Sequence, residues 1–121
     1  MYTAIVAGRQ NAYKYSKFRR SFHLDFNDKQ YIKEHGFLKL EEDAYRILSN
    51  RLEVTPLNDG QQTPYYGNPI FKAQHATACC CRKCVQKWHS IPRYKQLNQE
   101  DLRQLVGRVM LWIRKEMMNP A

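Results

Sequence analysis

The chain has 121 residues, of which 43% are hydrophobic, so it is long enough for one folded domain and too apolar for a disordered protein. Lys and Arg number 20 against 11 Asp and Glu, which gives a formal net charge of +9. No run of 18 apolar residues is present, and the N-terminus lacks a signal-peptide pattern. We therefore expect a single cytoplasmic domain over residues 1–121, without a transmembrane helix.

The first part of the chain combines aromatic and basic residues. Residues 1–12 are weakly patterned and predict an N-terminal arm. In residues 13–23 (YKYSKFRRSFH), Tyr15, Phe18 and Phe22 stand at helical spacing with Lys and Arg residues between them. This pattern is suited to stacking on nucleobases and contact with phosphates. It is also the pattern of aromatic side chains in a core beside a solvated basic face.

Two helices are expected before the middle of the chain. Asn27 or Asp28 can cap a short helix that runs through His35 and stops at Gly36. A clearer helix is predicted over residues 40–52, because its apolar residues recur every three or four positions and acids occupy its first turn.

The second half contains a long loop and further helices. Residues 54–69 are rich in Pro, Gly and Asn and predict a loop, with a short hairpin around Asp59–Gly60. Pro69 suits the first position of a helix that leads into a cysteine cluster, and Asn98 with Asp101 begins a strong final helix. The fold class is mostly α (or α+β with a small sheet), with helices around a Cys/His cluster.

All four cysteines fall within six positions, where a disulfide would close almost no loop. This favours a reducing compartment and thiols that bind metal, pack as buried inert groups, or serve redox or iron–sulfur chemistry. Cys81-x-x-Cys84 has a spacing that lets two thiolates reach one zinc ion, and Cys80 is a competing ligand. The basic neighbours Arg82 and Lys83 favour thiolates.

Two histidines flank the cysteines, and His23 is a distant third candidate ligand. In one straight helix, His75 and His89 would lie roughly 21 Å apart, too far for a single ion. Either only one of them is a ligand, or the helix breaks near Ala78–Cys80. We expect the break, with Cys81 and Cys84 in the first turn of a second helix. The candidate metal ligands are Cys81, Cys84, His89, His75 and Cys80, and zinc is the expected ion.

The basic surplus attracts polyanions, which makes nucleic acid or an acidic protein partner more plausible than a membrane, because no basic amphipathic helix stands out. A basic protein without any polyanion ligand is the plain alternative. The residues expected to contact phosphates or a partner are Lys14, Lys17, Arg19, Arg20, Arg82, Lys83, Lys87, Arg93 and Lys95.

Two blocks resemble a bacterial and phage family, catalogued as domain of unknown function 4186. They are residues 58–64 (NDGQQTP), continuing through Gly67, Pro69 and Phe71, and residues 74–92 (QHATACCCRKCVQKWHSIP). Weaker similarity extends to Phe18 and Arg19, to residues 21–24, and to Trp112 and Ile113. The resemblance implies that His23, His75, Cys80, Cys81, Cys84 and His89 are the positions to suspect. The family pattern usually has threonine at the position of Cys79, the least expected ligand, and histidine at that of Asn68.

Three functions compete. The first is a zinc-stabilised basic module that binds nucleic acid or a nucleoprotein complex. The second is a phage or mobile-element protein that inhibits a host defence complex, such as a CRISPR effector, by protein contact. The third is a metal-dependent nuclease or hydrolase, in which a histidine acts as base and Asp59 orients it; we favour a non-enzymatic role, because no paired carboxylates lie near the cysteines.

Overall fold

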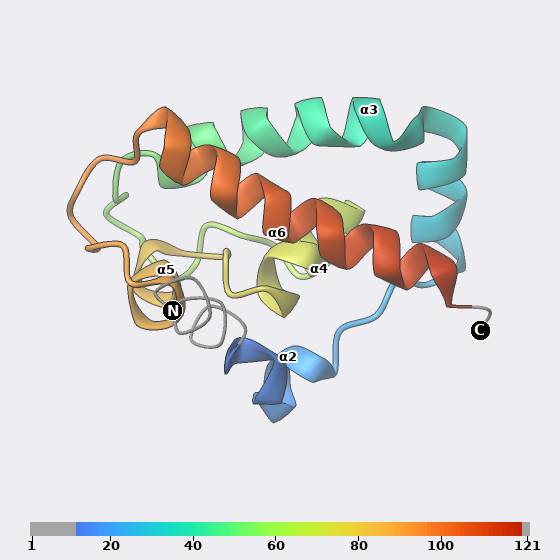
Figure 1. The fold of residues 1–121 in the computed structure, drawn as a ribbon, viewed down its shortest axis with the longest axis horizontal. Coiled ribbons are helices and arrows are strands. Elements are labelled where there is room, and N and C mark those ends of the chain that lie inside the picture. Colours follow the sequence, from blue (N-terminus) through green and yellow to red (C-terminus); the bar gives the residue numbers. More distant parts are fainter. Residues whose placement is uncertain (1–11, 120–121) are drawn as a thin grey trace, which may run out of the picture.

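A computed structural model describes residues 12–119, and in this part of the chain all regular structure is helical. Figure 1 shows the long helices α3 and α6 side by side, with the shorter elements below and behind α6 in this view. The mostly α prediction is confirmed, whereas the small sheet and the hairpin at Asp59–Gly60 have no counterpart among the described residues. The elements are η1 (Ala12–Tyr15), α2 (Lys17–Arg20), α3 (Phe26–Leu52), α4 (Pro69–Ala76), α5 (Arg82–His89) and α6 (Gln99–Met118). The predicted N-terminal arm lies almost wholly outside the described residues.

Helix α3 contains both helices predicted before residue 52. It begins two or three residues earlier than expected, because Asp25 rather than Asn27 or Asp28 is the N-cap. The Asp25 and Asp28 side chains accept from each other's backbone N–H groups, at 2.8 Å to Asp25 Oδ1 and 3.0 Å to Asp28 Oδ2. The predicted stop at Gly36 is present as a kink, with φ of 82° and ψ of 161°. Glycine tolerates this backbone conformation, so the helix changes direction and resumes at once.

The core lies where α3, α6 and α4 meet. Asn98 and Asp101 form the predicted capping box of α6, and Asn68 caps α4 with Pro69 at its first position. Each fully buried Leu or Ile contributes about 1.5–3 kcal/mol relative to exposure. The main buried side chains are Leu40, Leu48, Leu52, Ile70, Leu105, Val109 and Ile113.

Residues 53–68 form the long loop expected from the sequence. Its start is tied to the segment before α6, since Leu97 N–H donates to Glu53 O at 3.0 Å and the Thr55 hydroxyl donates to Arg93 O. These contacts close the loop over the end of the molecule that carries α5. Among the described residues, no helix combines the length and apolarity needed to cross a membrane.

Candidate metal centre

The cysteine cluster sits in a sharp turn between α4 and α5. Ala78 has a positive φ of 62°, and Cys79 N–H donates back to Gln74 O at 2.7 Å, so the chain reverses directly after α4. The Gln74 side-chain amide donates to Cys79 O at 2.9 Å and fixes the same turn. The predicted helix break near Ala78–Cys80 is therefore confirmed. Cys81 caps α5, with its Sγ accepting from Cys84 N–H at 3.3 Å.

Three thiols converge at this turn. The Sγ atoms of Cys80, Cys81 and Cys84 all lie within 4.8 Å of one another, which is close enough to hold a metal ion. Cys80 and Cys81 are buried, and Cys84 is half-buried. The structure thus brings together three of the five candidate ligands.

Arg19 of α2 lies against these thiols. Its Nη2 donates to Cys84 Sγ at 3.2 Å, and its Nη1 donates to His75 O at 2.6 Å and approaches Cys80 Sγ at 3.8 Å. The guanidinium carbon is also 5.8 Å from the centre of the Trp88 ring. The side chain is only 8% exposed, so a buried positive charge faces the sulfur atoms.

The three thiols share their protons unequally. Hydrogen bonds from the Cys80 and Cys81 thiols, and then the charge of Arg19, hold the pKa of Cys84 far below its ordinary value. Donation to Cys81 and Cys84, together with burial, raises the pKa of Cys80. Cys84 is therefore the most acidic of the three thiols, and a metal cation bound by all three would displace their protons.

The two flanking histidines lie outside the thiol group. His75 Nε2 is 3.1 Å from Thr63 O, and the ring lies nearly parallel to those of Tyr65 and Phe22, with ring centres 4.3 and 5.3 Å away. His89 Nε2 is 2.8 Å from Thr77 O, and burial lowers its pKa to about 4. Both rings thus direct Nε2 to backbone carbonyls, and their role as ligands stays a prediction.

Cys79 and His23 also lie apart from the three thiols. Cys79 Sγ is 3.7 Å from His89 Nε2, and burial raises the pKa of its thiol to about 11. His23 Nδ1 is 3.2 Å from Glu116 Oε2 on α6. Neither side chain belongs to the group that could hold an ion.

Asp59 holds α5 in place from the long loop. Its Oδ1 accepts from Arg82 N–H at 2.8 Å and its Oδ2 from Lys83 N–H at 3.1 Å, so the carboxylate binds the first turn of the helix. Arg93 Nε donates to Oδ2 at 2.8 Å. Sequence reasoning offered Asp59 as an orienter of a catalytic histidine, but its carboxylate binds α5 and Arg93 instead. The feature of the sequence that could have indicated this role is the Asn-Asp-Gly turn at residues 58–60, which contains Asp59.

The candidate contact residues divide into two groups. The prediction that Arg82 contacts a phosphate or a partner is wrong. Arg82 is fully buried and its guanidinium donates to Leu52 O and Pro92 O, so it cannot reach a phosphate on the surface. Arg19 is buried against the thiols in the same way, and Arg93 is half-buried beside Asp59. The exposed members are Lys14, Lys17, Arg20, Lys83, Lys87 and Lys95.

The chain resembles a protein family along nearly its whole length. The sequence model of the family described as domain of unknown function (DUF4186) matches residues 9–114, nearly the whole chain. The chain belongs to this family. No solved structure matches it.

The match spans both blocks noted in the sequence, so the DUF4186 domain includes the Asp59 turn, the thiol group and most of α6. The two positions noted as departures from the DUF4186 pattern have separate surroundings here. Asn68 accepts from Ile70 N–H at 2.9 Å as the cap of α4, and Cys79 is buried beside His89. Neither position contributes an atom to the three-thiol group.

Proposed function

We propose that this DUF4186 protein is a small zinc-binding protein that binds nucleic acid through a basic surface. The observation that carries the proposal is the convergence of Cys80, Cys81 and Cys84 beside Arg19. Arg19 belongs to the basic segment of η1 and α2, so the thiol group and that segment are joined directly. A metal ion at the thiols would fix α5 and the basic segment in one arrangement.

Zinc suits this donor set. Thiolates are soft ligands, and zinc–sulfur bonds of about 2.3 Å place sulfur atoms about 3.8 Å apart in a tetrahedron, so the observed group, within 4.8 Å, needs only a small contraction. Three thiolates and Zn²⁺ carry a net charge of −1, which the buried guanidinium of Arg19 balances. A water molecule or one further side chain would complete the tetrahedron.

Nucleic acid is a suitable ligand for the exposed positive charges that lie outside the thiol group. The formal net charge of +9 favours a polyanion, and six of the predicted contact residues are exposed. Lys83 and Lys87 lie on α5, the helix that begins at the thiol group. Lys33 is exposed and lies on α3, so it offers a matched control outside η1, α2 and α5.

The metal is tested by elemental analysis of the purified protein, where we expect about one zinc ion per chain. A metal-free protein with unaltered thiols would refute the zinc site. Nucleic-acid binding is tested by titrating single-stranded and duplex oligonucleotides at increasing salt. About six phosphate contacts predict a loss of affinity of roughly 300-fold for a single strand between 50 and 200 mM salt, and of on the order of a thousandfold for a duplex.

The matched variants locate the surface. Lys87→Ala should weaken binding and reduce the salt slope by about 1, while Lys33→Ala should leave both unchanged. Affinity that does not vary with salt would contradict the proposal. A complex with a host protein that survives nuclease treatment would favour the protein-partner alternative, and metal-dependent cleavage of DNA or RNA would favour the nuclease.

A further inference from the structure

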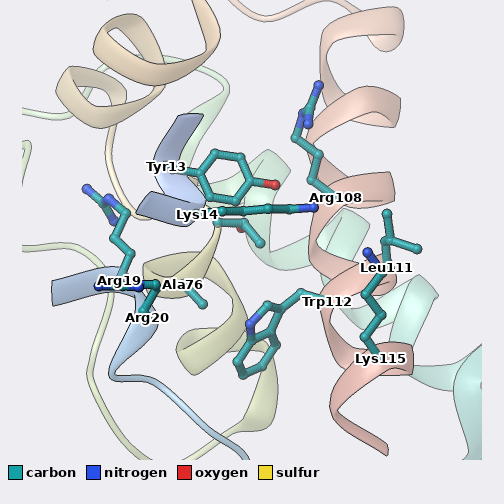
Figure 2. Close-up of a pocket in the computed structure, with 10 residues that line it drawn as sticks. Tyr13, Lys14, Arg19, Arg20, Ala76, Arg108, Leu111, Trp112 and Lys115 are labelled. Atoms are coloured by element: carbon teal, nitrogen blue, oxygen red, sulfur yellow. The ribbon is translucent and has the colours of Figure 1, made fainter. Parts of the chain in front are cut away.

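A pocket of about 110 Å³ lies on the side of η1 and α2 that faces α6. We call it the cationic pocket and define it by Tyr13, Lys14, Arg20, Arg108, Trp112 and Lys115. Figure 2 shows Lys14 reaching from η1 toward α6, where Lys115 lies on the same side as Leu111. The pocket therefore draws its side chains from segments about 95 residues apart in the chain.

Its charge is of one sign. Four of the six defining residues are Lys or Arg, and none of the described residues that line the pocket is acidic. The ammonium groups of Lys14 and Lys115 are close enough to interact: partial desolvation, and then the charge of Lys115, lower the pKa of Lys14. Holding these cations together is unfavourable by itself, and an anion between them would offset the repulsion.

The rest of the wall is aromatic and apolar. Trp112 is half-buried and faces the pocket, and Leu111 is 52% exposed at its edge. The Tyr13 ring is buried and held by the His89 ring, with the ring centres 5.5 Å apart. An inorganic anion requires no aromatic wall, whereas an unpaired nucleotide presents a phosphate and a flat base together.

The volume of the cationic pocket favours one nucleotide of a longer strand over a whole small molecule. Clefts that enclose a whole small molecule usually measure roughly 300–1,000 Å³, well above the 110 Å³ found here. A phosphate and one edge of its nucleoside fit such a space, while the neighbouring units of the strand would lie outside it.

We propose that the cationic pocket binds one unpaired nucleotide of a single-stranded nucleic acid, with its phosphate at Lys14 and Lys115 and its base against Trp112. This rests on the proposed function and names the form of nucleic acid that the protein selects. Duplex bases are stacked and paired, so their faces cannot reach Trp112.

Tryptophan fluorescence tests the assignment directly, because the chain has only two tryptophans, Trp88 and Trp112. The probe is an oligothymidylate of about eight nucleotides, compared with a duplex of equal length. The single strand should quench the emission of the wild-type protein and of Trp88→Phe, and quenching should be lost in Trp112→Phe. Quenching that follows Trp88 instead would overturn the proposal.

The affinity is tested with paired charge variants. Lys14→Ala/Lys115→Ala should weaken binding of the single strand about tenfold or more, while Lys33→Ala/Lys39→Ala, which removes the same charge from α3, should not. Thermal melts by circular dichroism confirm that each variant is folded. If the protein binds the strand but both double variants bind equally, the pocket assignment is wrong and the proposed function stands. If no oligonucleotide binds and a phosphopeptide does, both are wrong.

Discussion

Replacing Asp59 by asparagine removes one carboxylate charge at the start of α5 and keeps the size of the side chain. In the structure Oδ1 accepts from Arg82 N–H and the Gln62 amide at 2.8 and 2.9 Å. Oδ2 accepts from Lys83 N–H and Arg93 Nε at 3.1 and 2.8 Å. The carboxylate is only 2% exposed, so water cannot replace these four donors.

The cost follows from this burial. Removing one partner of a buried ion pair typically costs 3–5 kcal/mol, and because the Arg93 side chain is 30% exposed we take the lower end. Asparagine also turns an NH₂ group toward donors that need an acceptor. We expect Asp59→Asn to lower the free energy of unfolding by about 3 kcal/mol, which lowers Tm by roughly 10–15 °C for a domain of this size.

The effect should depend on pH in a defined direction. Burial opposes ionisation, but donation from Gln62, Arg82 N–H and Arg93 outweighs it and lowers the pKa of Asp59 below 3.8. A lowered pKa in the folded state means that the stabilisation is present above the unfolded pKa and is lost as pH falls through the folded pKa. The difference in Tm between wild type and Asp59→Asn should therefore be full at pH 7 and shrink below pH 4.

Asp25→Asn is the matched control, because Asp25 also caps a helix but its side chain is 59% exposed. Asparagine caps a helix about as well as aspartate does, so Asp25→Asn should cost less than about 1 kcal/mol. Chemical and thermal denaturation of the two variants should therefore differ by about 2 kcal/mol or more. Equal destabilisation would refute the argument that burial, and not capping alone, makes Asp59 important.

Two further predictions concern the cysteines between α4 and α5 and the neighbouring His89. Cys84→Ser should release the proposed metal ion and lower Tm, while Cys79→Ser should retain the ion, because Cys79 lies outside the three-thiol group. Metal analysis that found both variants loaded would contradict this assignment. The pKa of His89 is lowered by burial to about 4, so the neutral ring stabilises the fold fully above pH 6.5, and about 3 kcal/mol is lost as pH falls from 6.5 to 4. Denaturation at several pH values measures this loss, and a stability that is constant over that range would exclude it.

Local patterns predicted the elements whose ends depend on neighbouring residues. The capping box of Asn98 and Asp101, the start of α4 at Pro69 and the interruption at Gly36 all involve residues within four positions of one another. The break at Ala78–Cys80 followed from a distance limit: a straight helix would separate His75 and His89 too far to share one ion.

Long-range contacts could not be predicted in this way. Arg19 and Cys84 are 65 positions apart, and Asp59 lies 23 positions before Arg82. In the sequence, Arg19 and Arg82 resemble the exposed bases next to them, because helical periodicity says nothing about which charged side chain meets a buried acceptor. Their burial depends on partners supplied by the tertiary fold: thiols for Arg19, and the carbonyl of Leu52 for Arg82.

Helix α5 explains why these contacts matter together. Eight residues are too few for a helix to be stable alone, so its stability must come from its surroundings. Asp59 binds its first turn, the Arg82 guanidinium binds carbonyl groups at the end of α3, and Cys81 with Cys84 would tie the same turn to a metal ion. Because these supports hold one small element, losing Asp59 and losing the proposed metal ion would remove overlapping stabilisation, and their costs should not add as those of distant sites do.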